Sequence, residues 1–367
     1  MSLAHKHAPQ HACRPGIVLA ALAALAVLAA LSALVGARGA DAGPAPAAEP
    51  LRLPAAWTLS RPLIAPVQPT EGEHISVKDP SVVFHEGKWH VFMTIRGRPR
   101  SHEIQYVAFE QWEEADKAPR AMLTIEPGYY CAPQVFYFRP HRKWYLIYQT
   151  GRKGRRPGLQ PTFATTETLG DPASWVPGGG LWGERDLEAT QRAIDFWVIC
   201  DAERAYLFFT SNNGHMWRMS TPLAEFPDGF RTAKAELALK ADIFEAGHTY
   251  SLLGRNEYLT VVEAQGPGGR RYYKAYLADR LDGAWRPLAD TWERPFAGEK
   301  NVRQPAPAWA DDISHGELLR TGADETLPVD PANLRFLIQG VTQRERAGKA
   351  YGDIPWRLGL LTPASAE

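Results

Sequence analysis

The chain repeats one β-hairpin phrase five times. Each copy has an extended apolar stretch, a turn with charged or glycine residues, and a second stretch that begins near an aromatic residue. The first copy is DPSVVFHEGKWHVFMT at residues 79–94. The aromatic residues of the five copies lie 52 to 78 residues apart: Trp89, Trp144, Tyr206, Tyr258 and Phe336. A repeat of this length indicates one supersecondary unit that packs against its neighbours.

A third extended stretch follows each hairpin. These stretches are residues 103–110, 161–167, 216–222, 271–279 and 356–363. No long helical periodicity is present after residue 50. Five such units predict an all-β fold, a five-bladed β-propeller. An irregular two-sheet β-sandwich is the alternative, although sandwich strands need not repeat a three-strand phrase five times.

The N-terminal segment has a different composition. Lys6 and Arg14 precede a 22-residue run of Ala, Leu and Val at residues 16–37, and an Ala/Pro-rich stretch follows. This order predicts a signal peptide over residues 1–42, or an uncleaved signal anchor, because the run is long enough to span a bilayer. A linker over 43–56 then leads to the propeller over 57–367. Both possibilities predict a propeller outside the cytoplasm, either secreted or membrane-anchored.

The overall charge does not indicate a polyanionic partner. The chain has 41 Lys and Arg against 41 Asp and Glu, so its net charge gives no reason to expect nucleic acid or an anionic membrane surface. The basic cluster GRKGRR at 151–156 is typical of a solvated loop. Cys131 and Cys200 fall on different predicted strands and at different depths, beyond the reach of a disulfide, so we expect two free, buried thiols.

A propeller brings equivalent strand positions together. The first strand of each blade lines the central channel, so the N-terminal ends of these strands form a ring around one mouth. Counting back from the aromatic residues places Asp79, Gln134, Asp195 and Glu245 in this ring, with His315 in the fifth place. Three clustered carboxylates repel one another and lower the stability of the fold, so such a cluster is typical of a functional site. The ring is therefore the predicted functional site.

The phrases around this ring resemble those of glycoside hydrolase family 62. They include VKDPSVVFHEGKWHVF, APQVFYF, DFWVICD, FPDGF, IFEAGHTY, DISHGELLRT and RLGLLTP, and they run in family order from about Trp57 to Pro363. The resemblance implies a five-bladed propeller and an inverting, exo-acting α-L-arabinofuranosidase that removes arabinose from arabinoxylan or a related plant polysaccharide.

The resemblance also implies roles for individual residues. Asp79 matches the general base, Glu245 the general acid, and Asp195 the third carboxylate, which orients the acid and raises its pKa. Lys78 and Tyr351 match residues of the sugar pocket, and we place Gln134 with them as substrate-binding because of its ring position. His315 matches a histidine associated with one calcium ion in the channel. No organic cofactor is implied, and we expect a monomer.

Three departures from the family pattern concern the polymer-binding surface. Thr150 stands where the family usually has Trp, an inserted basic loop follows it over 151–160, and Cys131 lies in GYYCAPQ, where Arg-Ala is common. Two other functions therefore stay open. One is a propeller that binds a furanose-decorated glycan without useful turnover. The other is a family 43-like xylosidase or arabinanase with the same three acids.

Overall fold

The computed structural model describes residues 49–183 and 185–365. The predicted signal segment, residues 1–42, lies outside the described residues, as do residues 43–48 of the predicted linker. Leu51 and Leu53 belong to the compact unit that runs to the C-terminus, and both pack against its core. No helix in the described part of the chain has the length and apolar character needed to cross a membrane.

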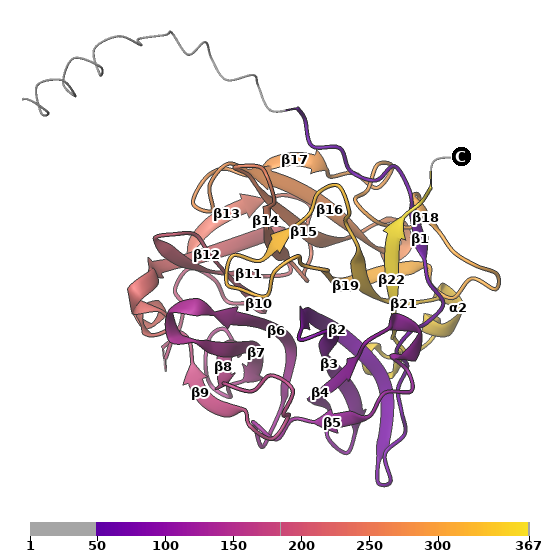
Figure 1. The fold of residues 1–367 in the computed structure, drawn as a ribbon, viewed down its shortest axis with the longest axis horizontal. Coiled ribbons are helices and arrows are strands. Elements are labelled where there is room, and N and C mark those ends of the chain that lie inside the picture. The colour runs from indigo at the N-terminus through magenta and orange to yellow at the C-terminus, as the bar shows by residue number, and fades with distance from the viewer. Residues whose placement is uncertain (1–48, 184, 366–367) are drawn as a thin grey trace, which may run out of the picture. The chain divides into compact units, whose positions relative to one another are not determined.

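Five β-sheets are arranged as blades around a common centre (Figure 1). Blade 1 contains β2 (Glu73–His85), β3 (Lys88–Arg98), β4 (His102–Phe109) and β5 (Arg120–Met122). Blade 2 contains β6 (Tyr130–Phe138), β7 (Lys143–Gly151), β8 (Leu159–Thr166) and β9 (Val176–Gly180). Blade 3 contains β10 (Ile194–Cys200), β11 (Arg204–Thr210), β12 (His215–Pro222) and β13 (Glu236–Lys240).

The last two blades each have five strands. Blade 4 contains β14 (His248–Leu252), β15 (Tyr258–Gln265), β16 (Arg271–Ala278), β17 (Arg286–Ala289) and β20 (Pro328–Val329). Blade 5 contains β19 (Asp312–Leu318), β21 (Phe336–Val341), β22 (Arg357–Pro363), β1 (Trp57–Leu59) and β18 (Val302–Arg303). The described helices are short: α2 (Gln343–Arg346), η1 (Trp112–Glu114), η2 (Arg139–His141), η3 (Leu223–Glu225), η4 (Asp228–Arg231), η5 (Pro267–Gly269) and η6 (Tyr351–Asp353).

The predicted all-β, five-bladed propeller is confirmed. Sequence reasoning missed the outer strand of each blade, because strands of three to five residues such as β5 and β13 are too short to show a period. It also missed the closure of the ring. N-terminal β1 pairs antiparallel with C-terminal β22, and the fully buried Trp57 donates its indole N–H to the Phe296 carbonyl at 2.6 Å.

Irregular pairing at the start of the blades shapes the channel mouth. Pairing between the first and second strands is interrupted in β2, β6, β10 and β19, as at a β-bulge. Four non-glycine residues at the starts of blades 1 to 4 have a left-handed backbone: Asp79, Ala132, Asp195 and Ala246. Bulges of this kind redirect side chains and are frequent beside active sites. Here they turn side chains toward the common centre.

Hydrogen bonds across the blades hold these turns in place. The N–H of Ala132 donates to Thr94 Oγ1 of blade 1 at 2.8 Å, and the N–H of Asp195 donates to Gln149 Oε1 of blade 2 at 3.1 Å. The same kind of bond recurs around the ring: Ala246 to Asp195 Oδ2, His315 to Glu263 Oε2, and Asp79 to Gln339 Oε1. Each blade thus fixes the backbone of the next, and the ring closes from blade 5 to blade 1.

A buried ion pair lies in β19 and just beyond it. Glu317 Oε1 is 2.9 Å from Arg320 Nη2, and neither side chain is more than 1% exposed. The guanidinium also donates to the carbonyls of Val82 and Val135, so it joins blades 1, 2 and 5. Removing one partner of a buried pair leaves an uncompensated charge, whereas replacing both partners by apolar residues is often nearly neutral.

We expect Glu317→Ala to lower the free energy of unfolding by about 3–5 kcal/mol, measured by urea denaturation. The double variant Glu317→Leu/Arg320→Met should recover most of this loss. If Glu317→Ala lowers the free energy of unfolding by less than about 1 kcal/mol, the ion pair does not hold blades 1, 2 and 5 together.

Candidate active site

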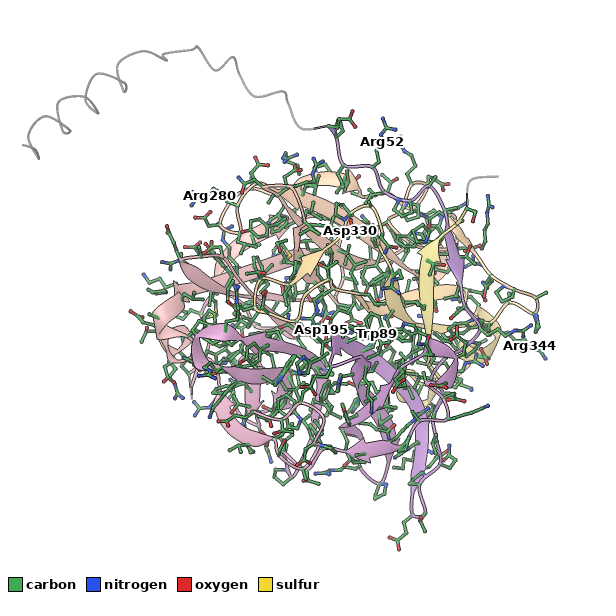
Figure 2. All side chains as sticks on the ribbon, in the orientation of Figure 1. Arg52, Trp89, Asp195, Arg280, Asp330 and Arg344 are labelled. Atoms are coloured by element: carbon green, nitrogen blue, oxygen red, sulfur yellow. The ribbon has the colours of Figure 1, made fainter. Side chains whose placement is uncertain are left out.

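A cavity of about 500 Å³ lies at the channel mouth and is lined by residues from all five blades. Its walls are Lys78, Asp79, His102, Tyr129, Cys131, Gln149, Arg192, Ile194, Asp195, Asn212, Phe244, Glu245, Arg271, His315, Gln339 and Tyr351. Figure 2 shows Asp195 near the centre of the ring of blades. The fold therefore brings together all of the sequence-predicted site residues except Gln134.

Gln134 does not line this cavity. Its Nε2 donates to the Val198 carbonyl at 2.9 Å and its Oε1 accepts the Val198 N–H at 2.7 Å, so the side chain joins β6 to β10. Both hydrogen-bonding ends of the amide are used by the protein. The count back from the aromatic residues misplaced Gln134 because the turn between β6 and β7, residues 139–142, is longer than the turn between β2 and β3, residues 86–87. Ala132, which precedes a proline as Asp79 does, occupies the equivalent of the Asp79 position.

Asp79 is buried between two cationic groups. His315 Nδ1 is 3.1 Å and Lys78 Nζ 3.9 Å from Asp79 Oδ1. Burial alone would raise the pKa of Asp79, but the charges of Lys78 and His315 outweigh it and hold the pKa well below its usual range. The carboxylate is therefore ionised at neutral pH.

His315 carries a positive charge in this setting. Burial disfavours the imidazolium, yet attraction from Asp79 and Asp195 is stronger and raises the pKa of His315 to about 9. Asp195 Oδ2 lies 3.7 Å from His315 Nδ1. The imidazolium thus lies between two carboxyl groups of the site.

Asp195 supports the start of blade 4. Its Oδ2 accepts the Ala246 N–H at 2.8 Å, which fixes the backbone directly after Glu245. Burial, and then the charge of Asp79, raises the pKa of Asp195 above its ordinary value, against the attraction of His315. Glu245 itself precedes the left-handed residue of its blade, as Lys78 precedes Asp79.

Glu245 is held in a different electrostatic state from Asp79. Asn212 Nδ2 donates to its Oε2 at 2.8 Å, and Arg271 Nη1 lies 3.2 Å from its Oε1. Burial, followed by the charges of Asp195 and Glu263, raises the pKa of Glu245 to about 7, although Arg271 opposes the shift. A large fraction of Glu245 is therefore protonated near neutral pH.

Two other sequence-predicted residues form one wall. Lys78 Nζ lies 4.8 Å from the ring centroid of Tyr351, a residue of η6 that is 50% exposed. Cys131 lies on the same cavity, with its Sγ 3.1 Å from the Tyr129 hydroxyl. Cys131 and Cys200 are both buried and free, as predicted.

Several residues of the site were missed by sequence reasoning. Arg271 and Asn212 bind Glu245, Glu263 bonds to Arg271, and Gln149 and Gln339 accept backbone N–H groups of the ring. A signal for part of this set was present. Thr94, Gln149 and Glu263 each lie five residues after the aromatic residue of their hairpin, and all three are polar in otherwise apolar strands.

The predicted calcium ion has no cluster of protein side chains around it in the described residues. Calcium takes six to eight oxygen ligands, whereas no group of three or more His, Cys, Asp or Glu side chains in the described chain is placed to hold a metal ion. His315, the residue matched to the ion by resemblance, forms an ion pair with Asp79. The calcium ion therefore stays a prediction from the resemblance, and no chemical step below depends on it.

Comparison with known proteins identifies the family of the chain. The model of glycosyl hydrolase family 62 matches residues 56–362. A protein of Cellvibrio japonicus named alpha-L-arabinofuranosidase C is 40% identical over 316 residues, which cover 85% of this chain and 47% of that protein. The chain thus spans about half the length of this curated relative.

Two solved structures are also similar. The catalytic domain of the Coprinopsis cinerea GH62 alpha-L-arabinofuranosidase has a TM-score of 0.77 and 37% identity, covering 84% of this chain and 97% of that one. The alpha-L-arabinofuranosidase of Podospora anserina, in complex with cellotriose, has a TM-score of 0.77 and 33% identity, covering 85% and 98%. Since the family model spans nearly all of the propeller, this protein belongs to glycosyl hydrolase family 62.

Proposed function

We propose that the protein is an exo-acting, inverting α-L-arabinofuranosidase that removes arabinofuranosyl side chains from arabinoxylan or a related plant polysaccharide. One observation carries this proposal. A single cavity holds two carboxyl groups in opposite states, Asp79 ionised and Glu245 with a pKa of about 7. Two carboxyl groups whose pKa values differ in this way supply the base and the acid of glycoside hydrolysis.

The cavity suits a terminal sugar unit. It lies at the mouth of a channel whose deeper positions are occupied by side chains such as Gln134, Glu317 and Arg320, all of which are buried. A side branch or chain end can enter such a cavity, whereas a continuous polymer cannot thread through it. This geometry favours exo action on a branch over cleavage within a backbone.

The proposed reaction uses each acid once. Glu245 donates its proton to the glycosidic oxygen of the departing polysaccharide while the bond from that oxygen to the anomeric carbon breaks. A water molecule attacks the same carbon from the opposite face and transfers a proton to Asp79, which inverts the anomeric configuration. Asp195 accepts the N–H of Ala246, the residue after Glu245, and Arg271 donates to the Glu245 carboxylate.

Asp79 is a weak base, because Lys78 and His315 stabilise its charge. A weak base accepts a proton only when the water oxygen has already become acidic by bonding to carbon. This timing agrees with an oxocarbenium-like transition state, in which departure of the leaving group runs ahead of attack. Lys78 and His315 thus keep the base ionised without requiring it to be strong.

We expect a change at Asp195 to move the pH dependence. The pKa of Glu245 is raised by burial and then by the charge of Asp195. Asp195→Asn keeps an oxygen that can accept the Ala246 N–H but removes the charge, so the pKa of Glu245 falls. The acid must be protonated to act, and activity is lost as pH rises through its pKa. The basic limb of kcat/KM should therefore shift to lower pH.

The measurement is a pH–rate profile on an arabinoxylan oligosaccharide for wild type and Asp195→Asn. Asp171→Asn, a change at an exposed loop residue, serves as the control and should leave the limb in place. A basic limb that does not move, or that moves to higher pH, would show that Asp195 does not raise the pKa of Glu245.

The substrate assignment is tested by incubation with arabinoxylan, arabinan and arabinogalactan, followed by chromatography of the released sugars. We expect free arabinose and an intact backbone from at least one polymer. Release of xylose or of arabinan oligosaccharides would favour a family 43-like activity instead. Saturable binding to all three polymers without any product would identify a glycan-binding propeller. Export, predicted from residues 1–42, would place the protein with such extracellular polymers.

A further inference from the structure

The catalytic cavity continues into a groove beside blade 3. A second hollow, of about 410 Å³, is lined by Pro157, Gly158 and Leu159 and shares Arg192, Ile194 and Asn212 with the cavity. A third hollow, of about 470 Å³, also contains Arg192 together with residues such as His215 and Trp217. Arg192 thus lies where three hollows meet. We call these two further hollows the blade 3 groove.

One wall of the blade 3 groove is the inserted loop between β7 and β8. Thr150, at the start of this loop, is buried and hydrogen-bonds to Thr162 at 2.8 Å, so it presents no side chain to the groove in place of the family's usual Trp. The loop is closed by a hydrogen bond from the Arg152 N–H to the Gly158 carbonyl at 2.7 Å. The loop therefore has a defined place beside the active site.

Positive charge is concentrated along this wall. Residues 151–158 contain Arg152, Lys153, Arg155 and Arg156 and no acidic residue, although the whole chain is neutral. Among the described residues, Arg152, Lys153 and Arg192 form no salt bridge, and Arg192 is exposed.

Two acidic residues lie nearby and do not pair with these three cations in the described chain. Asp186 Oδ1 accepts the backbone N–H of Arg156 at 3.0 Å, and Glu188 lines the third hollow. Arg192 thus offers the groove a guanidinium that has no ion pair among the described residues, and Arg152 and Lys153 add positive charge on the loop beside it. A planar guanidinium matches a carboxylate with two parallel hydrogen bonds.

We propose that the blade 3 groove binds the polysaccharide next to the arabinofuranosyl branch and that its cations select polymers carrying uronic acid carboxylates there. This inference rests on the proposed arabinofuranosidase function and names the substrate class of the same site. Arg192 contacts the carboxylate at the junction of the hollows, and Arg152 and Lys153 add attraction from the loop. Trp217 contributes an aromatic surface for sugar rings in the third hollow.

The test compares each polymer with its own carboxyl-reduced form, in which every uronic acid has become a neutral sugar. We expect wild type to release arabinose from native glucuronoarabinoxylan with a kcat/KM about fivefold higher than from the reduced polymer, the scale of one exposed charge pair. Added salt should abolish the difference, because it screens exposed charges. Arabinan-bearing pectin, treated in the same way, distinguishes a galacturonate from a glucuronate as the preferred source of the carboxylate.

Variants assign the preference to the groove. Arg192→Gln and Arg152→Gln/Lys153→Gln should each bring the native-to-reduced ratio toward one. Arg344→Gln is the matched control: Arg344 is exposed on α2 and lies at the periphery of the ring, away from Asp195 (Figure 2), so its ratio should stay that of wild type.

Two failures are distinguishable. Equal release from native and reduced forms of both polymers would overturn this inference and leave the arabinofuranosidase function standing. Release of arabinose from no polymer at all would overturn the proposed function itself.

Discussion

Asp79→Asn should lower turnover on polysaccharide by at least about 10²-fold, the lower end of a general-base contribution. Asparagine has nearly the same shape, and the backbone bond from residue 79 to Gln339 does not depend on its side chain. The variant loses only the charge between His315 and Lys78 that accepts the proton from water. The fold should be unchanged, as checked by circular dichroism.

Azide provides a sharper version of this test. Azide is an anionic nucleophile that needs no deprotonation, so it should restore turnover of an activated aryl arabinofuranoside by Asp79→Asn and yield the β-configured arabinofuranosyl azide. Asp171→Asn should match wild type without azide. A near wild-type rate for Asp79→Asn on polysaccharide would remove Asp79 from the mechanism.

Glu245→Gln should lower the rate on arabinoxylan far more than the rate on an activated aryl arabinofuranoside. Protonation matters for a sugar hydroxyl, which is a poor leaving group, and hardly matters for an activated phenol. We expect a loss of about 10²–10⁴-fold on arabinoxylan, the range of general acid catalysis, and less than about tenfold on the aryl substrate. The glutamine oxygen can still accept from Arg271, so the residual binding geometry is kept.

The aryl substrate serves as the internal control for Glu245→Gln, because it reports on folding and sugar binding in the same variant. The pH–rate profile of Glu245→Gln on the aryl substrate should also lack the basic limb, because residue 245 can no longer lose a proton. Equal losses on both substrates would mean that Glu245 supports the cavity rather than donating a proton.

The fold could be predicted because its signal is repeated. Five copies of a hairpin followed by a third strand determine a propeller, and each copy independently supports the others. Outer strands such as β9, with the sequence VPGGG, carry no such signal. The pairing of β1 with β22 joins residues about three hundred positions apart, and a three-residue strand does not indicate its partner in advance.

The site was predicted in part. The turn of the second hairpin, residues 139–142, is longer than that of the first, residues 86–87, so counting back from the aromatic residue gave Gln134 where the fold places Ala132. The opposite protonation states of Asp79 and Glu245 were also outside the reach of the repeat itself. They depend on burial and on Arg271, Glu263 and His315, which the chain brings in from other strands and blades.

The ring of left-handed residues explains how the site is held rigid. Non-glycine residues rarely adopt this conformation, which costs about 1–2 kcal/mol each. Asp79 and Asp195 both adopt it, and hydrogen bonds from the neighbouring blade fix their N–H groups. Part of the strain is therefore located at two carboxylates of the proposed active site, where a precise direction of the side chain has functional value.

The most direct test of the account is the stereochemistry of the first product. Proton NMR of an arabinoxylan hydrolysis mixture, recorded before mutarotation, resolves the two anomers of arabinofuranose. If water attacks with Asp79 as base while Glu245 protonates the leaving group, β-L-arabinofuranose appears first and the α-anomer follows. Initial formation of the α-anomer would require a covalent intermediate and would contradict the division of roles between Asp79 and Glu245.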